Sequence, residues 1–257
     1  MASAISTKSF RGVWRRTELF EPRGQLGPAA DREKIVIWLQ SSSGLFIDIR
    51  VCPDVEDNTN PLNLKSFAGT GEYDSALQHF TWTRVMDFRP PGAPDIGLVN
   101  FTSPGVIEED GVLPGDDFKE VWTQQLDDIN DSSAVGDFVS EVQSSCGKRK
   151  GYFLVIGEYF AFTLSRESVL STDTLNSYFD GTSDLTTEDT KLLMQHVCVV
   201  GKTIDWTVLY TLDNFTLGCN ILPGQSVISE LLSSLQWTEV EGVVPECLSP
   251  HLMCGSE

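Results

Sequence analysis

The sequence is poor in basic residues, and this scarcity argues against several classes of partner. Its 257 residues include 18 Lys and Arg against 37 Asp and Glu, so the formal net charge is −19 at pH 7. The longest basic run is Lys148-Arg149-Lys150, and Arg15-Arg16 is the other short one. Proteins that bind nucleic acids or anionic membrane surfaces cluster their cations. We therefore expect no nucleic-acid partner.

Long hydrophobic runs are also missing. No apolar run approaches the roughly 20 residues that a membrane-spanning helix needs, so we expect no membrane span. The first residues, MASAISTKSFRG, contain no continuous apolar segment of the kind found in secretory signals. The six cysteines are irregularly spaced and form no Cys-x-x-Cys pair. We expect a cytoplasmic protein with reduced thiols, and the nucleus as a second compartment.

Motifs for catalysis and metal binding are absent as well. The histidines His79, His196 and His251 are scattered, without a cysteine or carboxylate at the spacing of a metal site. The chain has no Gly-x-Ser-x-Gly and no phosphate-binding P-loop. We expect no metal, no cofactor and no assignable catalytic residue. The alternative is an enzyme of unknown reaction that uses barrel arginines and the carboxylates Asp48, Asp87, Asp95 and Glu108.

What the sequence does contain is a set of strongly alternating segments. From Ile35 to Val51, two apolar runs flank three serines and Gly44, as in an antiparallel hairpin. In the second run, Leu45, Ile47, Ile49 and Val51 alternate with Phe46, Asp48 and Arg50. Side chains in a strand alternate between its two faces, so one face is apolar and the other carries a carboxylate, a guanidinium and an aromatic ring.

The segment Phe80–Phe88 alternates in the same way. It predicts a strand whose first face carries Phe80, Trp82, Arg84, Met86 and Phe88. Arg84 then lies in the middle of an apolar face. Such a buried arginine needs a carboxylate or several other acceptors.

The rest of the chain favours an all-β fold with a few short helices. Further strands are predicted at 96–102, 105–111, 151–164, 197–202, 204–212 and 214–221. Residues 151–164 are apolar on both sides, as in strands buried on both faces. Apolar residues three and four apart predict helices at 117–129 and 226–235, and a third short helix near Thr187.

Three pairs of positions suggest that one unit occurs twice. Arg50 matches Arg166, Trp82-Thr83 matches Trp206-Thr207, and Trp122-Thr123 matches Trp237-Thr238. Each pair is 115 to 124 residues apart, which indicates a diverged repeat. We therefore expect two antiparallel β-barrels in tandem, at residues 10–130 and 146–245. The acidic stretch 130–145 is then the joint.

Two resemblances support this fold. Gly12-Val13-Trp14 is similar to the Gly-x-Trp that opens lipocalin-like barrels, where the tryptophan plugs the barrel floor. The order Trp-Arg-Arg, Phe46-Ile47-Asp48-Ile49-Arg50, Trp-Thr-Arg and Glu-Glu-Asp-Gly resembles a family of uncharacterised eukaryotic proteins. Its fungal members are named for interaction with a casein kinase 1. The resemblance covers residues 10–126 well and implies two lipocalin-like barrels, without implying an activity or a ligand.

The candidate ligand-binding residues lie on strands that we expect to be neighbours: Trp38, Phe46, Asp48, Arg50, Trp82 and Arg84. If their faces converge inside the first barrel, they form an aromatic-walled pocket with two cations and one anion. Two alternatives stay open: Asp48 forms a purely structural ion pair with Arg50 or Arg84, or this face lies outside the barrel.

Two functions follow from these observations. The first is a non-enzymatic protein that binds a small amphipathic or anionic ligand in a barrel. The second is an interaction module for a kinase-type partner, which the net charge and the family resemblance suggest. The two are compatible.

Overall fold

The computed structural model describes residues 5–28, 34–52, 62, 64–90, 95–125, 138–203, 205–211 and 227–242. Within these residues most of the regular structure is β-strand, accompanied by three α-helices of seven or eight residues and one turn of 3-10 helix, η1 (Thr7–Phe10). The expected all-β class with a few short helices is confirmed.

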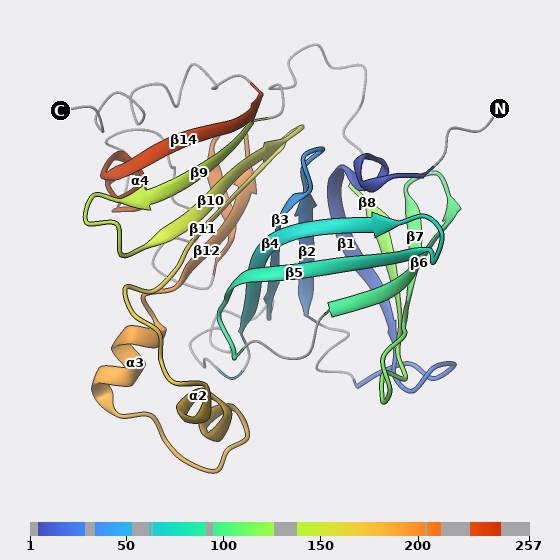
Figure 1. Ribbon diagram of the computed structural model, residues 1–257, viewed down its shortest axis with the longest axis horizontal. Helices are drawn as coiled ribbons and strands as arrows, with labels where there is room; N and C mark the ends of the chain where they lie inside the picture. The colour runs from blue at the N-terminus through green and yellow to red at the C-terminus, as the bar shows by residue number, and fades with distance from the viewer. Residues whose placement is uncertain are drawn as a thin grey trace.

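The first half of the chain forms a closed antiparallel barrel in which each strand pairs with the next. The last strand pairs with the first from Trp14↔Gln124 to Phe20↔Lys119, which completes the circle. The strands, which curve around the right of Figure 1, are β1 (Gly12–Phe20), β2 (Ile35–Gln40), β3 (Leu45–Val51), β4 (Lys65–Asp74), β5 (His79–Asp87), β6 (Asp95–Ser103), β7 (Val106–Gly111) and β8 (Lys119–Gln124).

The second half forms a six-stranded antiparallel sheet in the order β13-β12-β11-β10-β9-β14. Its strands are β9 (Phe138–Ser144), β10 (Lys150–Ile156), β11 (Tyr159–Leu164), β12 (Val197–Lys202), β13 (Thr207–Thr211) and β14 (Leu235–Gly242). The hairpin of β10 and β11 is apolar on both sides because its two faces belong to two different hydrophobic clusters.

The helices belong to the second half. In chain order, α2 (Thr172–Phe179) and α3 (Thr187–Leu193) come between β11 and β12, and α4 (Val227–Ser233) precedes β14. Figure 1 shows α2 and α3 below the second sheet. The helices expected near Thr187 and at 226–235 are confirmed, whereas α2 was not predicted from the sequence. Among the described residues, no helix has the length and hydropathy needed to cross a bilayer.

The helix predicted at 117–129 is wrong, because residues 119–124 form β8. Phe118, Val121 and Trp122 have helical spacing, but Glu120 and Trp122 also alternate with more exposed neighbours, as on a strand. β8 hydrogen-bonds with β1 on one side and β7 on the other. Closing the barrel satisfies the backbone groups on both sides, and this tertiary pairing outweighs a short local pattern. Residues 126–129 lie outside the described part.

A β-bulge changes the predicted face of β5. The register shifts so that Gly69 pairs with Arg84 while Ala68 pairs with Met86, which leaves Val85 as the extra residue. Met86 and Phe88 therefore pack outside the barrel and do not share a face with Arg84. Gly69 is required here, because a Cβ at this position would collide with the Thr83 carbonyl oxygen.

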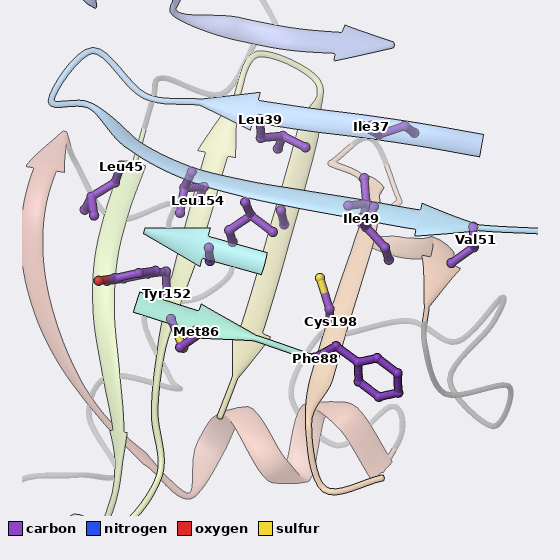
Figure 2. Packing of buried hydrophobic residues seen from close by; sticks show 14 of the residues in the cluster. Ile37, Leu39, Leu45, Ile49, Val51, Met86, Phe88, Tyr152, Leu154 and Cys198 are labelled. Atoms are coloured by element: carbon purple, nitrogen blue, oxygen red, sulfur yellow. The ribbon is translucent and has the colours of Figure 1, made fainter. Parts of the chain in front are cut away.

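The apolar face of β3 packs against the second sheet. Side chains of β2, β3 and the end of β5 form one buried cluster with those of β10 and β12, and Figure 2 shows them meeting between the two sheets. Leu45, Ile49 and Leu154 are among its members. Since the outer face of β3 is covered in this way, its other face, with Asp48 and Arg50, points into the barrel.

The second barrel and the repeat remain predictions. The described strands of the second half form one sheet with β13 and β14 at its edges, and the strand expected at 214–221 lies outside the described residues. Trp122 and Trp237, expected on and at the end of helices, both lie on strands. The domain limits 10–130 and 146–245 also remain predictions, although β9, within the expected joint, pairs with β10.

Candidate functional site

Aromatic residues fill one end of the barrel. Trp38 lies at the centre of this cluster, with ring centroids of Trp14, Phe80, Trp82 and Trp122 at 5.6–6.0 Å. Trp14, the tryptophan of the Gly-x-Trp, is fully buried and its indole N–H donates to the Phe10 carbonyl oxygen at 2.8 Å. The lipocalin-like expectation for this residue, a plug at one end of the barrel, agrees with its position.

Charged residues occupy the other end, around a cavity of about 350 Å³. Six of the 18 basic residues of the chain line it: Arg16, Lys34, Arg50, Lys65, Arg84 and Arg89. Four carboxylates also line it: Glu21, Asp95, Glu109 and Glu120. A third of all cations of a strongly acidic protein thus converge on one cavity, which we call the barrel pocket.

Ion pairs hold several of these cations in place. Arg50 donates from Nε to Oδ1 of Asp48 at 2.9 Å. Arg84 pairs with Asp87 at 3.2 Å and with Asp95. The contact between Arg84 and Asp87 depends on the bulge in β5, which places the two side chains on the same face of the strand. Each buried guanidinium therefore has an acceptor, as desolvated charges require.

One aromatic ring gathers three of the cations. Arg84 lies over Phe67 with 3.9 Å between its Cζ and the ring centroid, and Arg50 lies 5.2 Å from the same centroid. The Nζ of Lys65 is 5.4 Å from it. A ring face attracts cations, and here it holds three positive groups close to one another. Their mutual repulsion is relieved when an anion binds among them.

The pKa values reflect this crowding. Arg50, burial and Arg84 together lower the pKa of Lys65 to about 8. Burial raises the pKa of Asp48 despite the neighbouring Arg50. The pKa of Glu109 lies well above its usual value because Glu109 is buried and because Glu120 and Asp95 are close.

Five of the six sequence-predicted residues line one or both of two spaces inside the barrel. Trp38, Asp48, Arg50 and Trp82 surround a void of about 10 Å³ beneath the barrel pocket. Arg50 and Arg84 line the barrel pocket itself. Phe46 packs against Phe67 at 6.0 Å and lines neither space.

Several residues of the barrel pocket were not predicted from the sequence: Arg16, Lys34, Lys65, Arg89, Glu109 and Glu120. Arg16 lies two residues after the inward-facing Trp14, so strand alternation would have placed it inside the barrel. Glu120 lies two residues before Trp122 and could have been found in the same way, but this segment was predicted to be a helix.

The carboxylates suggested for acid/base catalysis do not form an activated pair. Asp87 and Asp95 both bind Arg84, while Asp48 binds Arg50. Glu108 pairs with Lys119 at 2.6 Å. In the described residues, no group of three or more histidine, cysteine or acidic side chains is arranged to hold a metal.

A Ser–His contact was not foreseen from the sequence. Ser66 Oγ and His196 Nε2 are 2.8 Å apart, between the barrel and the second sheet. Ser66 is 0% and His196 3% exposed, so a substrate cannot reach the hydroxyl. Burial lowers the pKa of His196 to about 3, which keeps the ring neutral. This pair is a packing contact.

Comparisons with known proteins provide a family assignment. A family model described as Protein HRI1 matches residues 24–193. The crystal structure of an uncharacterized protein, YLR301w from Saccharomyces cerevisiae, is similar with a TM-score of 0.44 and 16% identity, covering 60% of this chain and 73% of the yeast chain. No curated protein matches this chain.

Proposed function

The chain belongs to the Protein HRI1 family, and from the geometry of its barrel we propose that it is a non-enzymatic binding protein for a small, anionic, amphipathic molecule. The observation that carries this proposal is the convergence of six cations on the barrel pocket. Its volume of about 350 Å³ is within the roughly 300–1,000 Å³ of small-molecule sites.

The barrel pocket supplies the two kinds of contact that such a ligand needs. An anionic group binds beside Lys65, Arg50 and Arg84, where charge-assisted hydrogen bonds are strong. The apolar part lies against Leu19 and Phe118, which also line the pocket. Asp48, Asp87 and Asp95 keep Arg50 and Arg84 oriented. The same arginines therefore form structural ion pairs and contact the proposed ligand.

The enzyme alternative has less support. Of the carboxylates that it requires, Asp48, Asp87 and Asp95 are each paired with an arginine, and Glu108 is paired with Lys119. A general acid or base needs a proton-transfer partner within reach. The kinase-type partner rests on the net charge and the family resemblance, and it stays a prediction. The cytoplasmic location, with the nucleus as a second compartment, also stays one.

The proposal is tested with the fluorescent anion 8-anilinonaphthalene-1-sulfonate as the probe. We expect binding to the folded protein and a loss of about tenfold in affinity for Lys65→Met, the effect of one charge-assisted hydrogen bond. Lys119→Met is the matched control, because Lys119 pairs with Glu108 away from the pocket. Native mass spectrometry after incubation with a cell extract should show a retained small molecule. Equal probe affinity in both variants, with a bare protein mass in every extract, contradicts the proposal.

The affinity for this probe should depend on the charge of Lys65. Its pKa of about 8 means that the amine is charged below pH 8 and neutral above it. Anion binding should therefore weaken as the pH rises through 8, and binding at that pH should take up a proton. Calorimetry in two buffers of different ionisation enthalpy measures the proton uptake. Lys65→Met should remove the dependence, and a wild-type affinity that is flat across this range would show that Lys65 does not contact the anion.

A further inference from the structure

A second cavity, of about 450 Å³, lies where the barrel meets the second sheet. On the barrel side it is lined by the end of β5, from Arg84 to Asp87, and by Arg89. On the other side it is lined by the start of β10, the segment 165–170 after β11, and α2. We call it the interdomain cavity. The proposed ligand of the barrel pocket does not require it.

The charge of this cavity is opposite to that of the whole protein. Five cations line it against two carboxylates, Asp87 and Glu167, and Asp87 is already paired with Arg84. The cations are Arg84, Arg89, Lys148, Lys150 and Arg166. The two lysines come from the longest basic run of the sequence. Lys148, Lys150 and Arg166 do not line the barrel pocket, so the two sites can be tested separately.

The contacts of Arg166 give the main argument that this cavity binds an anion. Its Nη2 donates to the backbone carbonyl oxygens of Asp87, at 3.2 Å, and of Phe88. Its Nε is buried and has no hydrogen-bond acceptor among the described residues. Within that part of the chain, neither Arg166 nor the two lysines form an ion pair with a carboxylate. The Cζ of Arg166 also lies 5.9 Å from the centroid of the Phe88 ring. A half-buried cation held by carbonyl groups and a ring face, without a carboxylate, is incompletely compensated, and an incoming carboxylate supplies what is missing.

Aliphatic side chains at the same cavity indicate a protein partner. Val169 is 92% exposed and Val85 is 64% exposed, and both line the cavity. Buried Met86, Leu170 and Leu175 continue the apolar lining. Exposed apolar residues beside charged ones are typical of interaction surfaces. An extended peptide presents acidic and aliphatic side chains alternately, which matches this combination.

We propose that the interdomain cavity docks an acidic peptide segment of a partner protein, with a carboxylate beside Arg166 and an aliphatic side chain between Val85 and Val169. Outside the two cationic cavities, the net charge of −19 repels such a segment. The interdomain cavity therefore attracts an acidic partner, and the repulsion elsewhere adds specificity.

The test uses a fluorescein-labelled peptide of alternating glutamate and leucine, and anisotropy with the full-length protein as the readout. We expect saturable binding that weakens with added salt. Lys148→Glu combined with Lys150→Glu should weaken it by about tenfold, the sum of two reversed surface charges. Lys8→Glu combined with Arg15→Glu is the matched control, since both residues are exposed on the barrel side, and it should stay within about twofold of the wild type.

Three results would overturn the proposal. One is equal peptide affinity in the two double variants. Another is equally tight binding of an uncharged glutamine–leucine peptide of the same length, which would show that the charge of the cavity is not used. The third is competition by inorganic phosphate at the concentration of the peptide, which would indicate a small-anion site. Urea unfolding of the Lys148/Lys150 variant checks that it is folded, and this measurement does not depend on anion binding at either cavity.

Discussion

Replacing Trp38 by alanine is expected to lower the free energy of unfolding by about 3–5 kcal/mol, the usual cost of truncating a buried aromatic residue. Trp38 is 2% exposed and its ring contacts five other aromatic rings. Its indole N–H donates to Oε1 of Gln40 at 3.2 Å. The alanine variant leaves a large void in the barrel and a buried amide oxygen without this donor.

Urea unfolding measures the free energy of unfolding of Trp38→Ala, and two further variants serve as comparisons. Trp38→Phe keeps most of the ring contacts and should cost clearly less than the alanine variant. Leu77→Ala is the control for a lost apolar side chain, because Leu77 is 59% exposed and such surface changes stay within about 0.5 kcal/mol. A cost below about 1 kcal/mol for Trp38→Ala would mean that the barrel interior is not packed around this residue.

The second large effect concerns the pair of Asp48 and Arg50. Asp48→Ala should destabilise the protein by about 3 kcal/mol, because it leaves a largely buried guanidinium without its main partner. This value is at the lower end of the range for buried pairs. Glu120 and Asp95 are close enough to attract Arg50 and to raise its pKa together with Asp48, so some compensation remains.

A double-mutant cycle separates the loss of the pair from the loss of packing. Asp48→Ala combined with Arg50→Met removes both charges, and it should recover most of the stability lost in the single variant, since apolar replacement of a buried pair is often neutral. If the double variant is as unstable as Asp48→Ala, the carboxylate acts by packing and not by compensating Arg50.

The candidate site shows how far alternation along single strands leads. Asp48 and Arg50 were placed on one face of a strand from their spacing alone, and that face points into the barrel. Lys65 could not be found in this way. It lies in the pocket because β4 pairs with β3 in a register that sets Lys65 opposite Arg50, and this register depends on both strands.

Met86 and Asp87 illustrate the opposite case, in which a regular pattern predicts the wrong face. Strict alternation predicts that Met86 shares a face with Arg84. Because of the bulge at Val85, Asp87 shares that face instead. The bulge accompanies the close approach of Gly69, on β4, to β5. The sequence of β5 alone contains no information about this contact with β4.

The sequence by itself determined the all-β class, the alternating faces of β3, and the position of Asp48 and Arg50 together on one of those faces. These properties depend on the spacing of apolar and charged residues along single segments, which can be read from the sequence. A barrel in the first half was expected from the sequence. The strand at 119–124 that closes it and the side of β3 that meets the second sheet were decided by the tertiary structure alone. Each of them depends on hydrogen bonds or apolar contacts between segments far apart in sequence, whose energies exceed local preferences.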